Sequence, residues 1–376
     1  MVRWEPRVDR ADAGVSPVVG MVLVLGISIV GIAAILYWGL PAIDEMKANV
    51  EHQSVESQFQ ELDATIKELV AGTTEKTAKR WQPTLNRGSV LLLNETEGWV
   101  YAVEFYVPNG GGGAPAEYDF VYSGFHDTDN AFAIKNRATF GLSSARVEAY
   151  RVTGTTSGQQ LQVIKADGTA WTAGEAWPAG ATRSLTLKDA QGQDVPIKNA
   201  TIRFRIYEGV PKIAEAWFVP TGRVDYRLDA GLGTKTVTQN NGAVISGNGR
   251  TAALLNPPPI PPITDAAGTP RFFARAVLLN ATGSFAGSDR FDVLVTLYST
   301  STLASYDCMA ADLSDCVKSS KLFLYGQNKD TWYGYLTNAG RGYKFVQKTD
   351  GVDYLEDRRP HMGYTLLQSN VQMTAG

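Results

Sequence analysis

Residue types that build reactive centres are scarce in this chain of 376 residues, which has three histidines and two cysteines. These numbers exclude a disulfide-dense scaffold and a site built from clustered Cys and His ligands. Basic residues are not in excess either, because 35 Lys and Arg stand against 38 Asp and Glu. A net charge of −3 offers no electrostatic footprint for nucleic acid, so nucleic acid is not an expected partner.

The short motifs of common enzyme classes are also missing. The sequence has no G-x-S-x-G elbow, no phosphate-binding P-loop and no H-E-x-x-H pair. The turn at residues 126–129 and the acidic residues beside the cysteines lack a full set of cation ligands. We therefore expect no catalytic residue, no metal site and no cofactor, and the sequence does not predict an enzyme.

Charge is absent from one long stretch, which runs from Val15 to Ile43. As a helix, the part from Val18 to Leu40 would be about 35 Å long, enough to cross a hydrocarbon core of roughly 30 Å. Ser16 followed by Pro17 is typical of an N-cap and a first helical position. The pair at 37–38, Tyr then Trp, lies where interfacial aromatics are common. The sequence predicts a membrane span over residues 15–43.

The orientation of this span follows from its basic flanks. Arg3, Arg7 and Arg10 precede the span, and Lys47 is the only Lys or Arg in the first dozen residues after it. Because Lys and Arg favour the cytoplasmic side, we expect the N-terminus inside and the C-terminal head outside, at the cell surface.

The start of the chain does not match an ordinary secretory signal, because the apolar run is too long and no small-residue cleavage site follows it. A short charged leader ending in Gly14, then Val-Ser-Pro-Val-Val-Gly and a long apolar helix, resembles the class III signal of archaeal type IV pilin-like proteins, which include archaellins. The residue before Gly14 is Ala13, where many members of that family have a basic residue. Val19 stands where bacterial pilins have a glutamate, which archaeal members commonly lack.

The resemblance covers about 60 residues, from Asp9 to roughly Val70, and implies a processed precursor. A prepilin-type peptidase would cut between Gly14 and Val15 and remove the leader, residues 1–14. The apolar helix would first hold the chain in the membrane and then pack against copies of itself or other pilin-like subunits as the core of a filament. The residues expected to shape this helix for assembly are Pro17, Gly20, Gly26, Gly31, Gly39 and Pro41.

A second helical pattern continues the first over residues 44–75. Apolar residues recur at a helical period among polar ones: Met46, Val50, Val55, Phe59, Leu62, Ile66 and Leu69. Residues 71–74 read as the helix end, and Pro41 as the place of a kink. We expect an amphipathic extension that lies against the protein's own head.

From Ser89 onward the period becomes two, with Gly, Pro, Asn and Asp between the runs, as antiparallel sheets require. The predicted fold class is α+β: a long N-terminal helix followed by a mostly antiparallel β-sandwich head. A proline-rich strap at 256–270 suggests two lobes, 88–255 and 271–376, although one continuous sandwich interrupted by the strap fits the pattern too. Predicted strands after the strap include Thr331–Leu336 and Tyr343–Gln347.

Two further features suit an external location. Cys308 and Cys316 are expected to form a disulfide. Sequons at Asn94, Asn199 and Asn280 make glycosylation chemically feasible, although the last two lie beside predicted strands. The tryptophans of the head are expected to pack in its core rather than line a sugar-binding face.

Two functions remain open at this point. In the first, the chain is a pilin-like surface subunit, minor or at the tip because its head is large, with contact to a cell or a surface glycan. In the second, it is a single-pass receptor or solute-binding ectodomain that never polymerises. An envelope enzyme with an unrecognised site is a weaker third reading.

Overall fold

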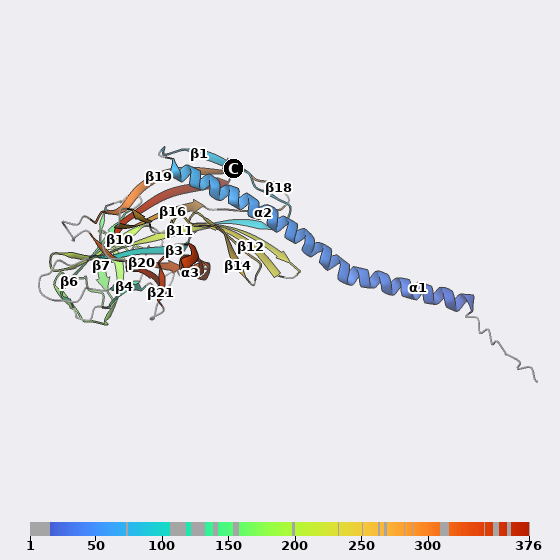
Figure 1. The fold of residues 1–376 in the computed structure, drawn as a ribbon, viewed down its shortest axis with the longest axis horizontal. Coiled ribbons are helices and arrows are strands. Elements are labelled where there is room, and N and C mark those ends of the chain that lie inside the picture. Colours follow the sequence, from blue (N-terminus) through green and yellow to red (C-terminus); the bar gives the residue numbers. More distant parts are fainter. Residues whose placement is uncertain are drawn as a thin grey trace, which may run out of the picture.

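The computed structural model describes residues 16–72, 74–105, 118–121, 132–137, 142–152, 158–197, 200–231, 233–249, 251–261, 264–266, 269–281, 283–287, 289–308, 316–341, 343–348, 353–358 and 362–375. A long N-terminal helix lies along a β-rich head and projects well beyond it (Figure 1). The sheets of the head are mostly antiparallel. The predicted α+β class is therefore confirmed.

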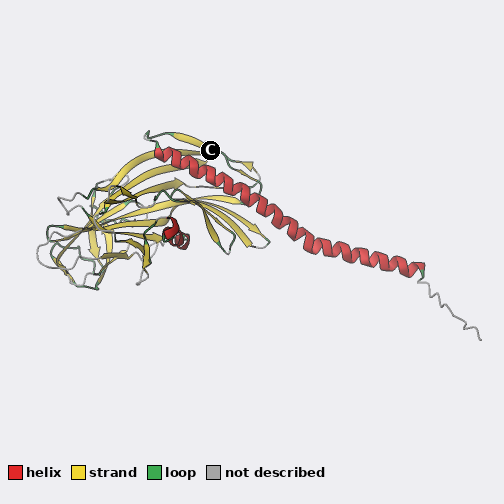
Figure 2. Cartoon of the chain, viewed as in Figure 1, coloured by secondary structure: helices red, strands yellow, loops and turns green. Residues whose placement is uncertain are grey.

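The projecting helix is one helical rod from Pro17 to Ala71. It consists of α1 (Pro17–Ala34), a π-helical turn η1 (Ile35–Gly39) and α2 (Leu40–Ala71). The π-turn lies just before Pro41, which has no N–H for the helical ladder and whose ring crowds the preceding turn, so the backbone widens there. Figure 2 shows the rod bending between its head-bound part and its projecting end.

The residues of α2 that contact the head differ from the predicted apolar residues at the N-terminal end of the helix. Val55, Phe59 and Leu62 are buried as expected, and so are the later members of the stripe. Met46 and Val50 are instead 67% and 68% exposed. Ala48 and Glu51 take the buried positions there, because they stay in phase with Val55 at spacings of three and four residues. The prediction was wrong for these two residues.

In the part of the head that the structure describes there are two large sheets and a two-stranded ribbon. One sheet has the order β1 (Ala78–Trp81), β19 (Val293–Tyr306), β23 (Gly363–Ala375), β16 (Thr269–Ala281) and β15 (Thr264–Ala266). The main path of the other is β21 (Val346–Lys348), β22 (Tyr354–Asp357), β20 (Val317–Tyr325), β3 (Ser89–Phe105), β11 (Lys212–Ala230), β10 (Ile202–Glu208), β6 (Leu142–Arg151), β7 (Gln160–Lys165), β9 (Thr182–Lys188), β5 (Phe132–Asn136) and β4 (Tyr118–Val121). Its branches are β12 (Gly233–Asn240), β13 (Ala243–Gly247), β14 (Ala252–Asn256), β17 (Gly283–Ala286) and β8 (Glu175–Trp177). The ribbon pairs β2 (Thr84–Leu85) with β18 (Asp289–Arg290).

Two long antiparallel strands, β3 and β11, form the spine of the head. They pair from Ala214 opposite Glu104 to Arg227 opposite Ser89. The register shifts beside Gly222. A Cβ atom at Gly222 would lie 2.2 Å from the carbonyl oxygen of Leu279, so the backbone of β16 can approach only because this residue is glycine.

The strands before and after the proline-rich strap belong to common sheets, so the two-lobe division does not separate two sheets. β20, which follows the strap, pairs with β3, which precedes it. The strap itself packs on the head: Ile260 is fully buried, and its carbonyl oxygen accepts a hydrogen bond from the Tyr343 hydroxyl at 2.6 Å. The Lys67 side chain of α2 donates to the Pro257 carbonyl oxygen at 2.9 Å.

Two strands predicted after the strap need correction. Residues 331–336 are helical and belong to α3 (Lys329–Leu336), followed by a 3₁₀ turn η3 (Ala339–Arg341). The buried side chains Trp332, Tyr333 and Leu336 lie on one helical face. Over so short a segment, this helical spacing is hard to distinguish from the alternation of a strand. Residues 343–345 are not in a strand, and only the end of the predicted segment forms β21.

The apolar interior has three clusters. One fills the end of the head around Phe132, Phe204 and Phe218, and a second surrounds Trp99, Trp217 and Trp332. The third lies between α2 and the sheets. Five of the six head tryptophans are buried and Trp171 is partly buried, which confirms core packing for these residues.

Candidate functional site: the apolar helix, its seam with the head, and a groove

The projecting part of the rod is apolar on all sides. No residue of α1 is buried, and large side chains such as Val18, Val30 and Leu36 are 70%, 67% and 53% exposed. The one hydroxyl of α1, on Ser28, donates to the carbonyl oxygen of Val24 at 2.8 Å, so α1 directs no side-chain donor outward. Residues 17–43 would span about 40 Å at 1.5 Å per residue. Among the described residues this is the one helix long and apolar enough to cross a membrane.

The glycines and prolines singled out for assembly all lie on this segment. Pro17 begins α1, and Gly39 ends the π-turn just before Pro41. At Gly20, Gly26 and Gly31 a Cβ atom would meet nothing within 4 Å. The described part of the chain therefore places no other helix against them, and their use in helix contacts stays a prediction. Gly14 and Val15 lie outside the described residues.

An aromatic pair and the first charges mark the end of the apolar segment. Tyr37 and Trp38 are each 76% exposed on the π-turn. Asp44, the first charged residue after them, pairs with Arg87 of the head, with Oδ1 at 2.8 Å from Nη1. Glu45 then pairs with the nearly buried Lys235 of β12 at 2.7 Å. The rod thus changes from unpartnered apolar surface to head-bound polar surface within about two turns.

We call the contacts of α2 with the head the seam. At its outer end the buried Glu51 carboxylate accepts hydrogen bonds from the backbone N–H and the side-chain amide of Asn86, at 2.8 and 2.7 Å. At its inner end the fully buried Asp63 contacts Lys67 at 2.7 Å and the Asn256 amide at 2.9 Å. Because these bonds fix both the rotation of α2 about its own axis and its position along that axis, the head has one orientation on the rod.

The middle of the seam is apolar. Phe59 and Trp81 meet edge to face, with ring centroids 5.6 Å apart and an angle of 88° between the rings. The Trp81 indole N–H donates to the backbone carbonyl of Gln58 at 3.1 Å. Leu62 and Ile66 pack in the same cluster. Buried aromatic and aliphatic area of this kind supplies most of the binding energy between a helix and a sheet.

A groove of about 410 Å³ lies on the opposite face of the strands that α2 covers. Val224 of β11 packs under α2, whereas its neighbours Arg223 and Asp225 line the groove, because neighbouring strand residues point to opposite faces. The turn before α3 closes one side with Gln327 and Asn328.

Arg223 and Asp225 line this groove and form a charged cluster with the buried Glu97, which the sequence pattern did not reveal; we call this cluster the floor of the groove. Arg223 lies 3.1 Å from Glu97 and 2.7 Å from Asp225. Asn328 donates to Glu97 at 3.2 Å, and Thr238 donates to Asp225 at 2.8 Å. Burial raises the pKa of Glu97 to about 7 even though Arg223 lowers it, and burial also raises the pKa of Asp225. Charges alternating with apolar residues along 223–228 were the one local signal for this cluster.

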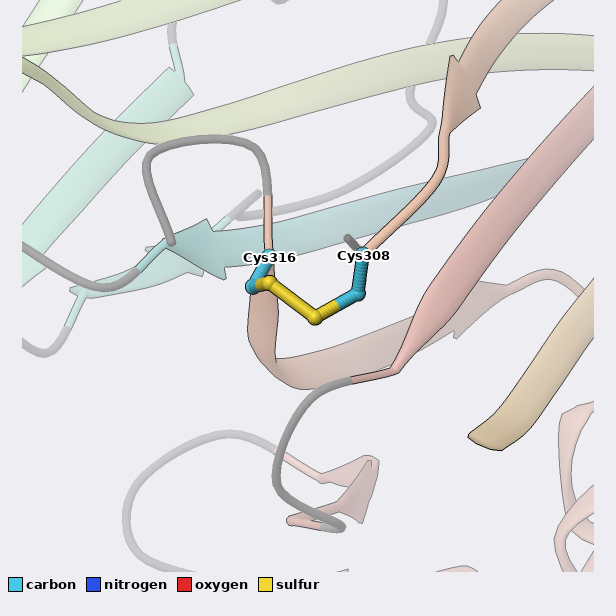
Figure 3. Close-up of a disulfide and its surroundings, with 2 residues drawn as sticks. All are labelled: Cys308 and Cys316. Atoms are coloured by element: carbon cyan, nitrogen blue, oxygen red, sulfur yellow. A yellow bond between two sulfur atoms is a disulfide. The ribbon is translucent and has the colours of Figure 1, made fainter. Parts of the chain in front are cut away.

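The other predicted sites lie elsewhere on the head. Cys308 and Cys316 are joined by a disulfide that connects the end of β19 to the start of β20 (Figure 3). Asn94 is half-buried in β3, while Asn280 is exposed at the end of β16 despite its place in a strand. Asn199 lies outside the described residues, as do 126–129. No group of three or more metal-binding side chains occurs in the described part of the chain.

Comparisons of this chain with family models, with curated proteins and with solved structures found no match.

Proposed function

We propose that this chain is the precursor of an archaeal pilin-like surface subunit that is anchored in the membrane, and then assembles, through its N-terminal helix. The β-rich head is displayed outside the cell for adhesion or surface contact. The observation that carries the proposal is the apolar rod of residues 17–43, which contacts nothing in the described chain yet continues without a break into α2, which is fixed to the head.

The exposed rod needs an apolar partner. Burying one side chain the size of Val, Leu or Ile is worth about 1.5–3 kcal/mol, so the whole segment would gain on the order of tens of kcal/mol in lipid or against other helices. Either environment also suits its backbone, whose hydrogen bonds are internal. A lipid phase accounts for the anchored precursor, and copies of the same helix account for the assembled state.

The seam supports assembly over simple anchoring. A flexible linker would be enough to tether a head to a membrane. Here a rigid polar and apolar seam fixes the head to the same helix that would pack in the filament, with Asp44 already paired to Arg87 where the apolar segment ends. Neighbouring heads would then be set in a fixed arrangement by the packing of their helices.

Replacement of Gly14 by Phe tests the proposal. The bulky residue should block the peptidase, so intact mass would show the leader still attached, and the protein should stay in the membrane fraction instead of sheared surface filaments. Gly20→Ala is the matched control for processing, because it alters a helix position and leaves the cut site unchanged. Normal cleavage and filament recovery of the Gly14→Phe protein would refute the proposal.

The groove favours the second candidate function, a membrane-anchored ectodomain that binds a solute and never polymerises. This candidate keeps the same anchor, but it requires no cleavage at Gly14 and no contact between copies of α1. Cysteine at Gly26, within the exposed rod, would distinguish the two, because oxidative cross-linking between copies in native envelopes is expected only of an assembled helix.

A further inference from the structure

The floor of the groove has a polarity that the stability of the fold does not require. Glu97 is 1% exposed, and the side chains of Arg223 and Asp225 are 14% and 17% exposed. Well-packed apolar residues of similar volume would stabilise such a position as well or better, since removing charges from water offsets most of their attraction. Charged groups concentrated at the bottom of a concave surface are instead typical of ligand sites.

The charges of the floor nearly balance, which restricts the ligand. The charged residues that line the groove are Asp225, Arg223 and Arg227, and each arginine is already paired, Arg223 with Glu97 and Asp225 and Arg227 with Asp229. An anion placed there would meet Asp225, and a cation would meet the two arginines. Neither a phosphate nor an ammonium group therefore has a complementary environment, and an uncharged ligand does.

The groove offers hydrogen-bond donors and acceptors side by side. A guanidinium has five N–H donors, and a carboxylate accepts about four hydrogen bonds; the contacts of Arg223 and Asp225 with each other, with Glu97 and with Thr238 use only some of these. The amides of Gln327 and Asn328 add both kinds of group from the facing turn. A ligand that both donates and accepts at closely spaced positions, as neighbouring hydroxyl groups do, matches this arrangement.

Apolar side chains lie on both sides of the groove, Leu91 and Leu93 on β3 and Ile245 on β13, and the charged and hydroxyl side chains of β11 and β12 lie between them. A sugar ring has polar edges and C–H faces that suit polar groups placed between apolar sides. The volume of about 410 Å³ is within the usual range for small-molecule sites.

We propose that this groove binds an uncharged, hydroxyl-rich ligand of one or two rings, a neutral saccharide, with Arg223, Asp225 and Asn328 holding its hydroxyl groups. The inference goes beyond the proposed function, since it concerns the head and holds whether or not the rod assembles. The ligand is either a free sugar or the terminal unit of a surface glycan, which share this chemistry.

The test uses the full chain in a detergent without a sugar headgroup. The probes are glucose, galactose, mannose, N-acetylglucosamine, maltose and cellobiose at millimolar concentration, with glucose 6-phosphate and glucosamine as charged counterparts, followed by saturation-transfer NMR. A printed array of neutral glycans then distinguishes a glycan terminus from a free sugar. We expect at least one neutral sugar to bind and its charged counterparts to bind more weakly.

Two variants locate the site. Asp225→Asn keeps the volume but alters the acceptor, and should weaken binding about tenfold or more, which corresponds to about 1.4 kcal/mol. Ala252→Trp fills the groove from an exposed position without touching the floor, so it remains informative if Asp225→Asn does not fold. The matched control is Asp167→Asn, the same substitution in an exposed turn, which should bind as the unaltered protein does.

Three outcomes would overturn the proposal: no neutral sugar of the panel binds, a charged counterpart binds best, or Ala252→Trp binds unchanged. None of them bears on cleavage at Gly14 or on filament recovery, so this proposal and the proposed function can fail separately.

Discussion

Phe59 allows the seam between α2 and the head to be tested by one substitution. Its side chain is fully buried at the middle of α2 and meets the Trp81 ring edge to face at 5.6 Å. Phe59→Ala removes this contact and leaves a cavity between helix and sheets. Buried Phe→Ala changes cost about 3–5 kcal/mol, of which the aromatic pair supplies about 0.5–1.5 kcal/mol. We expect the unfolding free energy to fall by that total.

The assay is guanidinium unfolding of the full chain in detergent, followed by hydrogen exchange along α2. Val50→Ala is the matched control, because Val50 lies on the same helix but is 68% exposed, and its loss should change stability by no more than about 0.5 kcal/mol. Phe59→Ala should also speed amide exchange in the inner half of α2. If the two variants unfold alike, α2 is not held to the head as described.

Two further predictions concern the rod and the groove. Val30→Arg, at the centre of the apolar segment, should disfavour membrane insertion by about 2.5–3.5 kcal/mol and increase the fraction of protein released by alkaline carbonate. Met46→Arg is the control, because Met46 is equally exposed at 67% but lies beyond the segment, and it should not increase release. Equal release of the two variants would contradict a membrane span. The pKa of Glu97 is raised from 4.5 to about 7, so the folded state holds its proton longer than the unfolded state, and stability should fall by about 3 kcal/mol as the pH rises between those values. The measurement is the unfolding free energy at about pH 5 and about pH 8, and Glu97→Gln should remove the difference between the two values. If the unfolding free energy of the unaltered protein rises from pH 5 to pH 8 and that of Glu97→Gln does not, the direction of the pKa shift is wrong.

Local chemistry predicted the helical rod well. Pro17 begins it and Ala71 ends it, because proline geometry and the lack of charge act within a few residues. Which side of α2 is buried was predicted less well. Met46 and Val50 satisfy a helical spacing, yet they lie one position away from the residues that meet the head. Which apolar residues face inward depends on the head, which the helix sequence does not contain.

The sheets illustrate the limit of local patterns. The Asn241-Gly242 turn, with φ of 45° and 72°, joins β12 to β13. Asn-Gly is a strong hairpin signal, so this hairpin is predictable from the sequence alone. α3 imitated a strand because its eight residues are too few to separate periods of two and 3.6. The need for glycine at position 222 comes from β16, whose backbone passes beside it and is far away in the sequence.

The groove could not have been predicted from the spacing of residues in the sequence. Glu97, Arg223 and Asn328 come from segments far apart in the chain, and only the pairing of β3 with β11 and the turn before α3 bring them together. A buried charge cluster of this kind is a property of strand register rather than of any motif.

The first residue of the protein recovered from its native envelope tests the central claim most directly. Intact mass or N-terminal sequencing would measure it on the filament and membrane fractions. A chain that begins at Val15 and keeps the whole apolar helix is the predicted result. A chain that begins at Met1 or Val2 would contradict processing and assembly, and would leave a membrane-anchored ectodomain.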